Sequence, residues 1–181
     1  MEEYADKELL DQFRNEATRN YAFNLLVRKY QKKLYWHIRR IVIDHDDAND
    51  VIQNTFIKVW KALDNFKEDS QLYTWLYRIA TNESLTFLKQ KKAFVSFDDV
   101  SHGLSNSLQD DVFFKGDEIQ KRLQLAILTL PEKQRIVFNM KYFDEIKYEE
   151  MAVILETSVG ALKASYHHAV KKIEEYIKKG V

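Results

Sequence analysis

Cysteine is absent from this chain, and its 181 residues include one proline and four glycines. Without cysteine the chain can form neither a disulfide scaffold nor a thiolate metal site, and such a composition suits a reducing compartment. The shortage of glycine and proline leaves few residues for the tight turns that join β-strands. We therefore expect an all-α fold.

Long hydrophobic runs are missing as well. No uninterrupted apolar stretch approaches the roughly 20 residues that cross a membrane, and the opening residues MEEYADKELL contain neither a basic leader nor an apolar signal core. We expect a soluble, cytoplasmic protein with no membrane insertion. With 45% apolar and 31% charged residues, the chain can form one large domain or two small ones with modest cores.

Net charge is also lacking, because 28 basic residues balance 28 acidic ones. The charges are nevertheless unevenly placed, since residues 96–118 hold six acids and one base and lose helical periodicity. These features, together with serine, asparagine and glycine, are typical of a linker. We therefore predict two helical domains, residues 1–95 and 119–181, joined by an acidic, flexible linker over residues 96–118.

The first domain is expected to contain helices over about residues 6–16 and 20–43. A third, amphipathic helix should begin near Asp46 and Asp47, where negative charge suits a helix N-terminus. Its apolar stripe consists of Ile52, Phe56, Val59, Trp60 and Leu63. The roughly opposite stripe, polar with one isoleucine, consists of Asp50, Gln53, Asn54, Ile57 and Lys61. This polar stripe indicates either a partner-docking face or an ordinary solvated face.

A turn-rich break over residues 64–71 precedes an aromatic-rich helix over residues 72–92. The inward positions of this helix are Leu72, Trp75, Leu76 and Ile79. Arg78 and Asn82 share one edge with Trp75, whereas Tyr73 projects elsewhere. Aromatic rings beside cations and an amide can stack on unpaired bases, contact phosphates and recognise base edges. Aromatics at helical spacing are equally common in ordinary cores, so both interpretations stay open at this point.

The last third has the pattern of a helix-turn-helix, with helices over residues 148–155 and from 159 onwards separated by a break at 156–158. Pro131 is well placed at the first position of a preceding helix, whose core positions are Ile136, Val137, Met140 and Phe143. The buried stripe of the final helix consists of Val159, Leu162, Tyr166, Ala169, Ile173 and Tyr176. On the other side lie small and hydrogen-bonding residues suited to a DNA groove: Gly160, Lys163, Ala164, His167, His168 and Lys171.

Motifs for metal binding and catalysis do not stand out. No second histidine lies at ligand spacing from His37, and the neighbours His167 and His168 point about 100° apart on a helix. No Ser/His/Asp order, phosphate-binding glycine loop or carboxylate pair rises above the background of solvated charge. We therefore expect no metal site, no cofactor and no enzymatic activity.

Four segments, in the right order and spacing, carry a resemblance to a known family. They are DDANDVIQNTFIKVW from Asp46, TWLYRIATN from Thr74, LPEKQRIVF from Leu130 and ETSVGALKASYHHAVKKI from Glu156. With these segments the chain resembles, nearly end to end, the extracytoplasmic-function (ECF) branch of the bacterial sigma factors. Members of this branch consist of a promoter-melting domain, a linker and a helix-turn-helix domain. The resemblance implies an alternative sigma factor.

The resemblance also implies roles for individual residues. A surface for the clamp helices of core RNA polymerase would consist of Asp50, Gln53, Asn54 and Ile57. A surface for the minus-ten element would consist of Phe66, Lys67, Ser70, Gln71, Tyr73, Arg78 and Asn82. The final helix would recognise the minus-thirty-five element through Gly160, Lys163, Ala164, His167, His168 and Lys171. The chain departs from many members, which have arginine at the equivalents of Ser165 and His168.

The implied partners are core RNA polymerase, promoter DNA and an anti-sigma factor. Two other classes of function remain open. One is a stand-alone helix-turn-helix regulator, which would need neither the polar docking stripe nor the aromatic helix. The other is a helical adaptor that binds only protein, which would not need the hydrogen-bond donors Lys163 and His168.

Overall fold

The computed structural model describes residues 4–94 and 118–179, and all regular structure in these ranges is helical. The α-helices are α1 (Asp6–Arg14), α2 (Arg19–Val42), α3 (His45–Ala62), α4 (Leu72–Phe94), α6 (Glu118–Leu128), α7 (Glu132–Tyr142), α8 (Tyr148–Leu155) and α9 (Val159–Lys179). The all-α prediction is confirmed. Apart from Glu118, the predicted acidic linker lies outside the described residues. None of the helices in the described ranges combines the length and apolar character needed to traverse a bilayer.

Helix α2 is the centre of the first domain and packs against α1, α3 and α4. Leu26, Leu34 and Ile38 on α2 are almost fully buried. The C-cap of this helix is Ile43, whose positive φ of 72° is unusual for a β-branched residue, while its backbone N–H donates to the carbonyl of Arg39 at 2.8 Å. Burial of the Ile43 side chain stabilises this turn, which directs the chain from α2 into α3.

The buried face of α3 differs from the predicted apolar stripe. Its fully buried side chains are Ala48, Val51, Thr55 and Val59, whereas Ile52, Phe56 and Trp60 are only half-buried. The reason is that α3 packs against α2 and α4 at once, and the small Ala48 and Thr55 side chains permit that close approach. The three larger residues consequently lie at the rim of the core.

In the second domain α7 packs against α9 and α8, while α6 covers another part of α9. The helix-turn-helix has the predicted bounds, and its turn begins at Glu156, which adopts the left-handed conformation with φ 50° and ψ 47°. Two details were predicted wrongly. Pro131 is the N-cap of α7, with an extended ψ of 143°, so the first helical residue is Glu132. Tyr176 is 40% exposed because the last buried residue of α9 is Ile173 and the final turns project past the core.

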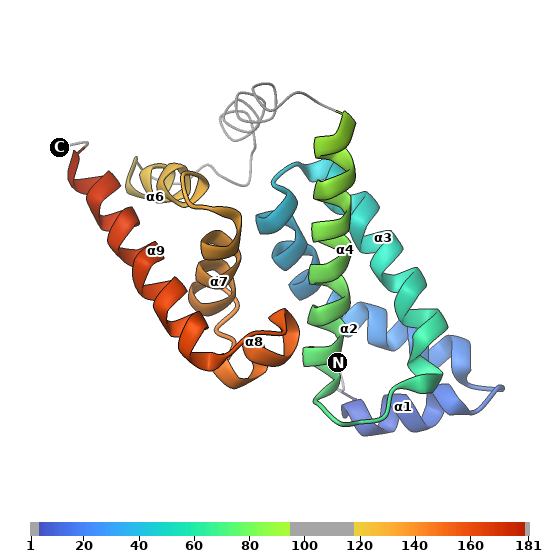
Figure 1. Cartoon of the computed structure of the whole chain (residues 1–181). Coiled ribbons are helices and arrows are strands. Elements are labelled where there is room, and N and C mark those ends of the chain that lie inside the picture. The colour runs from blue at the N-terminus through green and yellow to red at the C-terminus, as the bar shows by residue number, and fades with distance from the viewer. Residues whose placement is uncertain (1–3, 95–117, 180–181) are drawn as a thin grey trace.

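The two domains pack directly against each other. Figure 1 shows α1–α4 and α6–α9 as two groups that meet where α8 lies beside α4. Helix α7 also contacts α2, and one cluster of buried apolar residues continues from the first domain into α7, α8 and α9. Met140, Met151 and Leu162 are the second-domain members of this cluster with the least exposure. The relative position of the domains is therefore fixed by apolar packing as well as by polar contacts.

Candidate functional site

The outward face of α3 carries the predicted docking residues. The Asp44 side chain caps the helix by accepting hydrogen bonds from the backbone N–H groups of Asp46 and Asp47, at 2.9 and 3.0 Å. The four residues predicted to bind polymerase are all exposed: Asp50, Gln53, Asn54 and Ile57. Ile57 exposes 52% of its surface, so this otherwise polar face offers one large apolar side chain to a partner.

An apolar groove of about 570 Å³ borders this face, and sequence reasoning missed it. Its lining residues are Phe23, Val27, Gln31, Ile52, Gln53, Phe56, Ile57 and Trp60. The Phe23 ring meets the Trp60 ring edge to face, with centroids 4.9 Å apart, which gives the groove a rigid aromatic floor. Because the groove shares Gln53 and Ile57 with the polar stripe, polar and apolar contacts are available side by side. The sequence feature that could have indicated this groove is the pair of apolar residues Phe23 and Val27, which lie one helical turn apart on α2.

The residues predicted to contact the minus-ten element from the loop between α3 and α4, Phe66, Lys67, Ser70 and Gln71, are divided between core and surface. Phe66 is 7% exposed and packs against the Trp75 ring, with centroids 5.1 Å apart. Lys67 and Gln71 are exposed, and Ser70 is half-buried. The loop is tied back to the start of the chain, since the Arg14 guanidinium donates to the Glu68 carboxylate at 2.7 Å. In this conformation Phe66 supports the loop from beneath rather than presenting its ring to solvent.

The remaining predicted minus-ten residues lie along α4. Asn82 is exposed, but it lies ten positions after Leu72, which corresponds to about 15 Å of helix, so the structure does not bring Asn82 next to the loop. Tyr73 and Arg78 both contact the second domain. Arg78 forms an ion pair with Glu156, and the Tyr73 hydroxyl points towards Glu150. Burial and, to a smaller extent, the Glu150 carboxylate raise the pKa of the Tyr73 hydroxyl to about 12.

Beneath these contacts is a buried polar network that the sequence did not predict. Asp144, in the connection between α7 and α8, accepts a hydrogen bond from Arg40 at 2.7 Å and lies 2.9 Å from Nδ1 of His37. The other ring nitrogen of His37 is 2.8 Å from the Thr81 hydroxyl. Only 5% of the Asp144 side chain and 1% of the His37 side chain are exposed. The network therefore joins α2, α4 and the second domain away from water.

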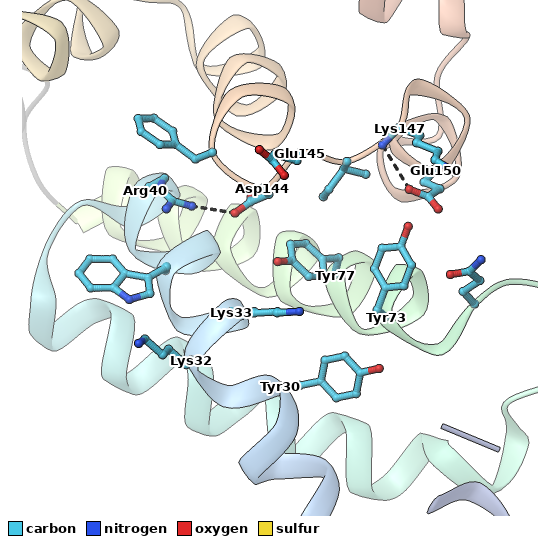
Figure 2. A pocket seen from close by; sticks show the side chains of 14 residues that line it. Tyr30, Lys32, Lys33, Arg40, Tyr73, Tyr77, Asp144, Glu145, Lys147 and Glu150 are labelled. Atoms are coloured by element: carbon cyan, nitrogen blue, oxygen red, sulfur yellow. Dashed lines mark hydrogen bonds and ion pairs between the residues drawn. The ribbon is translucent and has the colours of Figure 1, made fainter. Parts of the chain in front are cut away.

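Between the domains lies an open pocket of about 820 Å³, drawn in Figure 2. The first-domain wall includes Lys32, Lys33, Arg40, Tyr73 and Tyr77. Acidic residues of the second-domain wall are Asp144, Glu145 and Glu150, beside the single base Lys147. Figure 2 shows the Tyr73 ring beneath α8, with its hydroxyl directed towards Glu150. One wall of the pocket is thus mainly basic and aromatic, and the facing wall is mainly acidic.

The outward face of α9 carries the predicted minus-thirty-five residues. All of them are exposed: Gly160, Lys163, Ala164, His167, His168 and Lys171. Leu162, Ala169 and Ile173 anchor the opposite face in the domain core. A Cβ atom added at Gly160 would meet nothing within 4 Å, so packing inside the protein does not require glycine there. The helix has the geometry of a recognition helix with an unobstructed face.

Comparison with known proteins matches both parts of the chain. Residues 26–94 match the family model for Sigma-70 region 2, and residues 120–173 match the model for Sigma-70, region 4. The RNA polymerase sigma-H factor of Pseudomonas aeruginosa is 33% identical over 180 residues, which cover 94% of this chain and 92% of that protein. The ECF RNA polymerase sigma-E factor of Escherichia coli is 32% identical over 166 residues, 86% of each chain.

Two solved structures have similar folds. CnrH, solved in complex with the cytosolic domain of CnrY, superposes with a TM-score of 0.73 at 23% identity, covering 98% of this chain and 100% of that one. The sigma factor RpoE of Bartonella quintana, solved with the anti-sigma factor NepR, superposes with a TM-score of 0.67 at 21% identity, covering 86% and 96%. At this level of identity the two structures support the fold.

Proposed function

Since the chain belongs to the extracytoplasmic-function branch of the sigma-70 family and is an alternative sigma factor, we propose that its two domains bind different targets. The first domain, residues 1–95, docks on core RNA polymerase through α3 and binds the minus-ten element with the loop at 66–72 and α4. The second domain, residues 119–181, recognises the minus-thirty-five element with α9. Residues 96–118 serve as the acidic linker.

The observation that carries this proposal is that each domain exposes one helix face opposite a fully buried stripe. On α3 the exposed face is uncharged in its middle and adjoins an apolar groove, which suits a protein partner. On α9 the exposed face combines small residues with lysine and histidine, which suits phosphates and base edges. A stand-alone regulator would need only the second of these faces.

We propose no catalytic role for the chain. Asp144, His37 and Thr81 are linked in the order of carboxylate, imidazole and hydroxyl that hydrolases use to activate a nucleophile. However, Thr81 is 0% exposed, and its hydroxyl donates to the carbonyl oxygen of Tyr77 at 2.7 Å. Substrate has no route to this hydroxyl. In the described parts of the chain, no three His, Cys, Asp or Glu side chains are grouped as a metal ion would require.

The protein is proposed to act in the cytoplasm, where core polymerase and promoter DNA are found. We also propose an anti-sigma factor as an inhibitory partner, by analogy with the complexes of CnrH and RpoE named above. The groove beside Ile57 offers such a partner an apolar site that overlaps the polymerase-docking face. Binding of the inhibitor and of polymerase would then be mutually exclusive.

The experiment that tests the proposed function compares promoter binding with and without core polymerase. We expect the free chain to bind duplex promoter DNA weakly and without a minus-ten footprint, and the holoenzyme to protect both elements. The physical reason is that the minus-ten residues act on separated strands, which the free chain does not generate. Equal, sequence-specific footprints in the absence of polymerase would favour the stand-alone regulator.

Sequence recognition by α9 gives a prediction of its own. If His168 contacts a base edge, His168→Ala should cost about 1 to 3 kcal/mol on the preferred minus-thirty-five sequence and relax the preference at one position. Lys171→Ala should instead weaken all sequences alike and reduce the salt dependence by about one counterion. Holoenzyme binding to a library of minus-thirty-five variants, at fixed salt and pH, measures both effects. If His168→Ala leaves the preference for the minus-thirty-five sequence unchanged, the specificity belongs to Lys163, Ala164 and His167.

A further inference from the structure

Helix α1 lies outside the part of the first domain that the family model matches. The match to Sigma-70 region 2 begins at residue 26, whereas α1 ends at Arg14. Figure 1 shows the connection from α3 to α4 running beside α1, and two ion pairs join this connection to the α1–α2 corner. The connection includes residues 66–72, the minus-ten loop, to which the proposed function assigns binding of the minus-ten element.

We propose that α1 holds the minus-ten loop in the conformation that binds the DNA strand, with Arg14 as the positioning residue. This inference rests on the proposed role of the loop in binding the minus-ten element. It gives the N-terminal helix a part in promoter recognition, although the helix itself need not touch DNA.

Helix α1 is fixed to α2 and α3. The residues of its inward face, Leu9, Leu10 and Phe13, are all buried. The Phe13 ring meets the Trp60 ring of α3 edge to face, with centroids 5.3 Å apart. At the other end of α1, the Asp6 carboxylate accepts a hydrogen bond from the Tyr30 hydroxyl of α2 at 2.7 Å. A helix held at both ends and along one face is a rigid support for a neighbouring loop.

Two arginines at the corner between α1 and α2 reach the connection. Arg14, the last residue of α1, donates to the Glu68 carboxylate at 2.7 Å. Arg19, the first residue of α2, forms an ion pair with Asp64. Asp64 belongs to the short 3-10 helix Leu63–Asn65, which directly precedes the minus-ten loop. The connection is therefore held at two points, one just before the loop and one within it.

Glu68 has a backbone conformation that needs such support. Its φ of 60° lies in the left-handed region, which residues other than glycine seldom adopt unless surrounding contacts hold them there. The ion pair with Arg14 is a contact of this kind. Because Lys67 directly precedes Glu68, the backbone angles at Glu68 also determine where Lys67 lies relative to Ser70 and Gln71. Loss of Arg14 should therefore loosen the arrangement of the strand-binding residues.

The same ion pair changes the charge that the loop presents. Glu68 and Asp69 are adjacent, exposed acids in a segment that is proposed to contact a polyanionic strand. An unpaired carboxylate in this segment would repel phosphates, whereas the Glu68 carboxylate is paired with the Arg14 guanidinium. Arg14 thus stabilises the loop conformation and makes the loop less negative. The first effect alters recognition of the sequence, and the second alters binding to all sequences alike.

The expected effect of losing Arg14 is modest, because its ion pair is exposed. The side chains of Arg14 and Glu68 are 47% and 45% exposed, so solvent screens their attraction. Exposed ion pairs commonly shift an equilibrium by no more than about fivefold. We therefore expect Arg14→Ala to lower the selectivity for the minus-ten sequence about threefold. The protein should stay folded, since the substitution removes no buried contact.

The functional test measures the minus-ten selectivity of the holoenzyme. The probes are two premelted promoters, one with a minus-ten sequence from a start site mapped with this chain and one with that sequence scrambled. Selectivity is the ratio of the two affinities, so a change in general attraction to DNA cancels. We expect Arg14→Ala and Glu68→Ala each to lower this ratio about threefold, and the double variant to lower it no further. Arg14→Lys should retain most of the selectivity.

Lys7→Ala is the matched control. Lys7 is exposed and lies seven positions before Arg14, on nearly the same face of α1, so its replacement removes a like charge and leaves the ion pair in place. The ratio should not change in this variant. Equal losses in Lys7→Ala and Arg14→Ala would overturn the positioning role, because helix charge alone would then explain them. Additive losses from Arg14→Ala and Glu68→Ala would also overturn it, since residues that act through one contact lose that contact only once.

A second measurement follows the loop itself and does not depend on what the loop binds. The chain has no cysteine, so Asp69→Cys gives one site for a nitroxide spin label in the free, full-length protein. Arg14→Ala should make this label more mobile, whereas Lys7→Ala should not. An unchanged electron paramagnetic resonance spectrum in Arg14→Ala would overturn the positioning role. A more mobile loop with unchanged selectivity would show that the minus-ten assignment of the loop, on which the inference rests, is wrong.

Discussion

Ile57→Glu should weaken the binding of core RNA polymerase about thirtyfold or more while the fold stays intact. Ile57 is 52% exposed and lines the groove beside the polar stripe, so a docked partner would take it out of water. A carboxylate in its place would lose hydration without gaining a partner, and central interface residues are commonly worth about 2 kcal/mol or more. The same exposed change should alter the free energy of unfolding by less than about 0.5 kcal/mol. Titration of labelled chain with core polymerase measures the affinity.

The matched control for this variant is Tyr21→Glu. Tyr21 is 57% exposed on the first turn of α2 and is not among the residues that line the groove, so its replacement adds the same charge elsewhere in the domain. We expect this control to bind polymerase as the unmodified chain does. Equal affinities for Ile57→Glu and Tyr21→Glu would show that α3 is not the docking face. The milder double variant Gln53→Ala/Asn54→Ala should weaken binding in the same direction.

Removal of the Tyr73 ring should impair promoter opening. In the holoenzyme, Tyr73→Ala should reduce open-complex formation on duplex promoters about tenfold or more, because stacking on one unpaired base is worth about 1 to 3 kcal/mol. The loss should be smaller on a template already melted at the minus-ten region, since the cost of separating the strands has then been removed. Asn82→Ala should show the same difference between templates. Permanganate reactivity of unpaired thymines measures the open fraction.

Tyr73→Phe is the control for stacking, because it keeps the ring and removes only the hydroxyl, which points towards Glu150. We expect near-normal promoter opening for this variant. If the alanine and phenylalanine variants are equally defective, the ring does not stack on a base. Equal defects of Tyr73→Ala on duplex and premelted templates would instead indicate damage to the fold, which the thermal unfolding midpoint would reveal.

Features that depend on neighbours in the sequence were predictable. The helix-turn-helix could be bounded correctly because apolar spacing stops at Leu155 and resumes at Val159, and the polar residues between them cannot continue a buried stripe. The outward face of α3 could be assigned because 3.6-residue periodicity places Gln53 and Ile57 one turn apart. These inferences need no knowledge of where other helices lie.

Features that depend on distant partners were not predictable. His37 and Asp144 are separated by 107 positions, and neither residue carries a local pattern that points to the other. Phe66 could be placed in the loop but not in the core, because its burial is decided by the Trp75 ring across the turn. The groove beside α3 similarly depends on how α2 and α3 pack, which shifts Ile52 and Phe56 from the centre of the core to its rim. In each case the missing information is tertiary.

The most direct measurement is transcription by purified core polymerase on fragmented genomic DNA, with and without this chain, followed by mapping of the transcript 5′ ends. The account predicts start sites that appear only when the chain is present and that share elements near minus ten and minus thirty-five at one spacing. In the same assay, Ile57→Glu should abolish these starts, and Tyr21→Glu should preserve them. If the chain adds no start sites to those of core polymerase alone, it does not direct initiation, and the central claim is wrong.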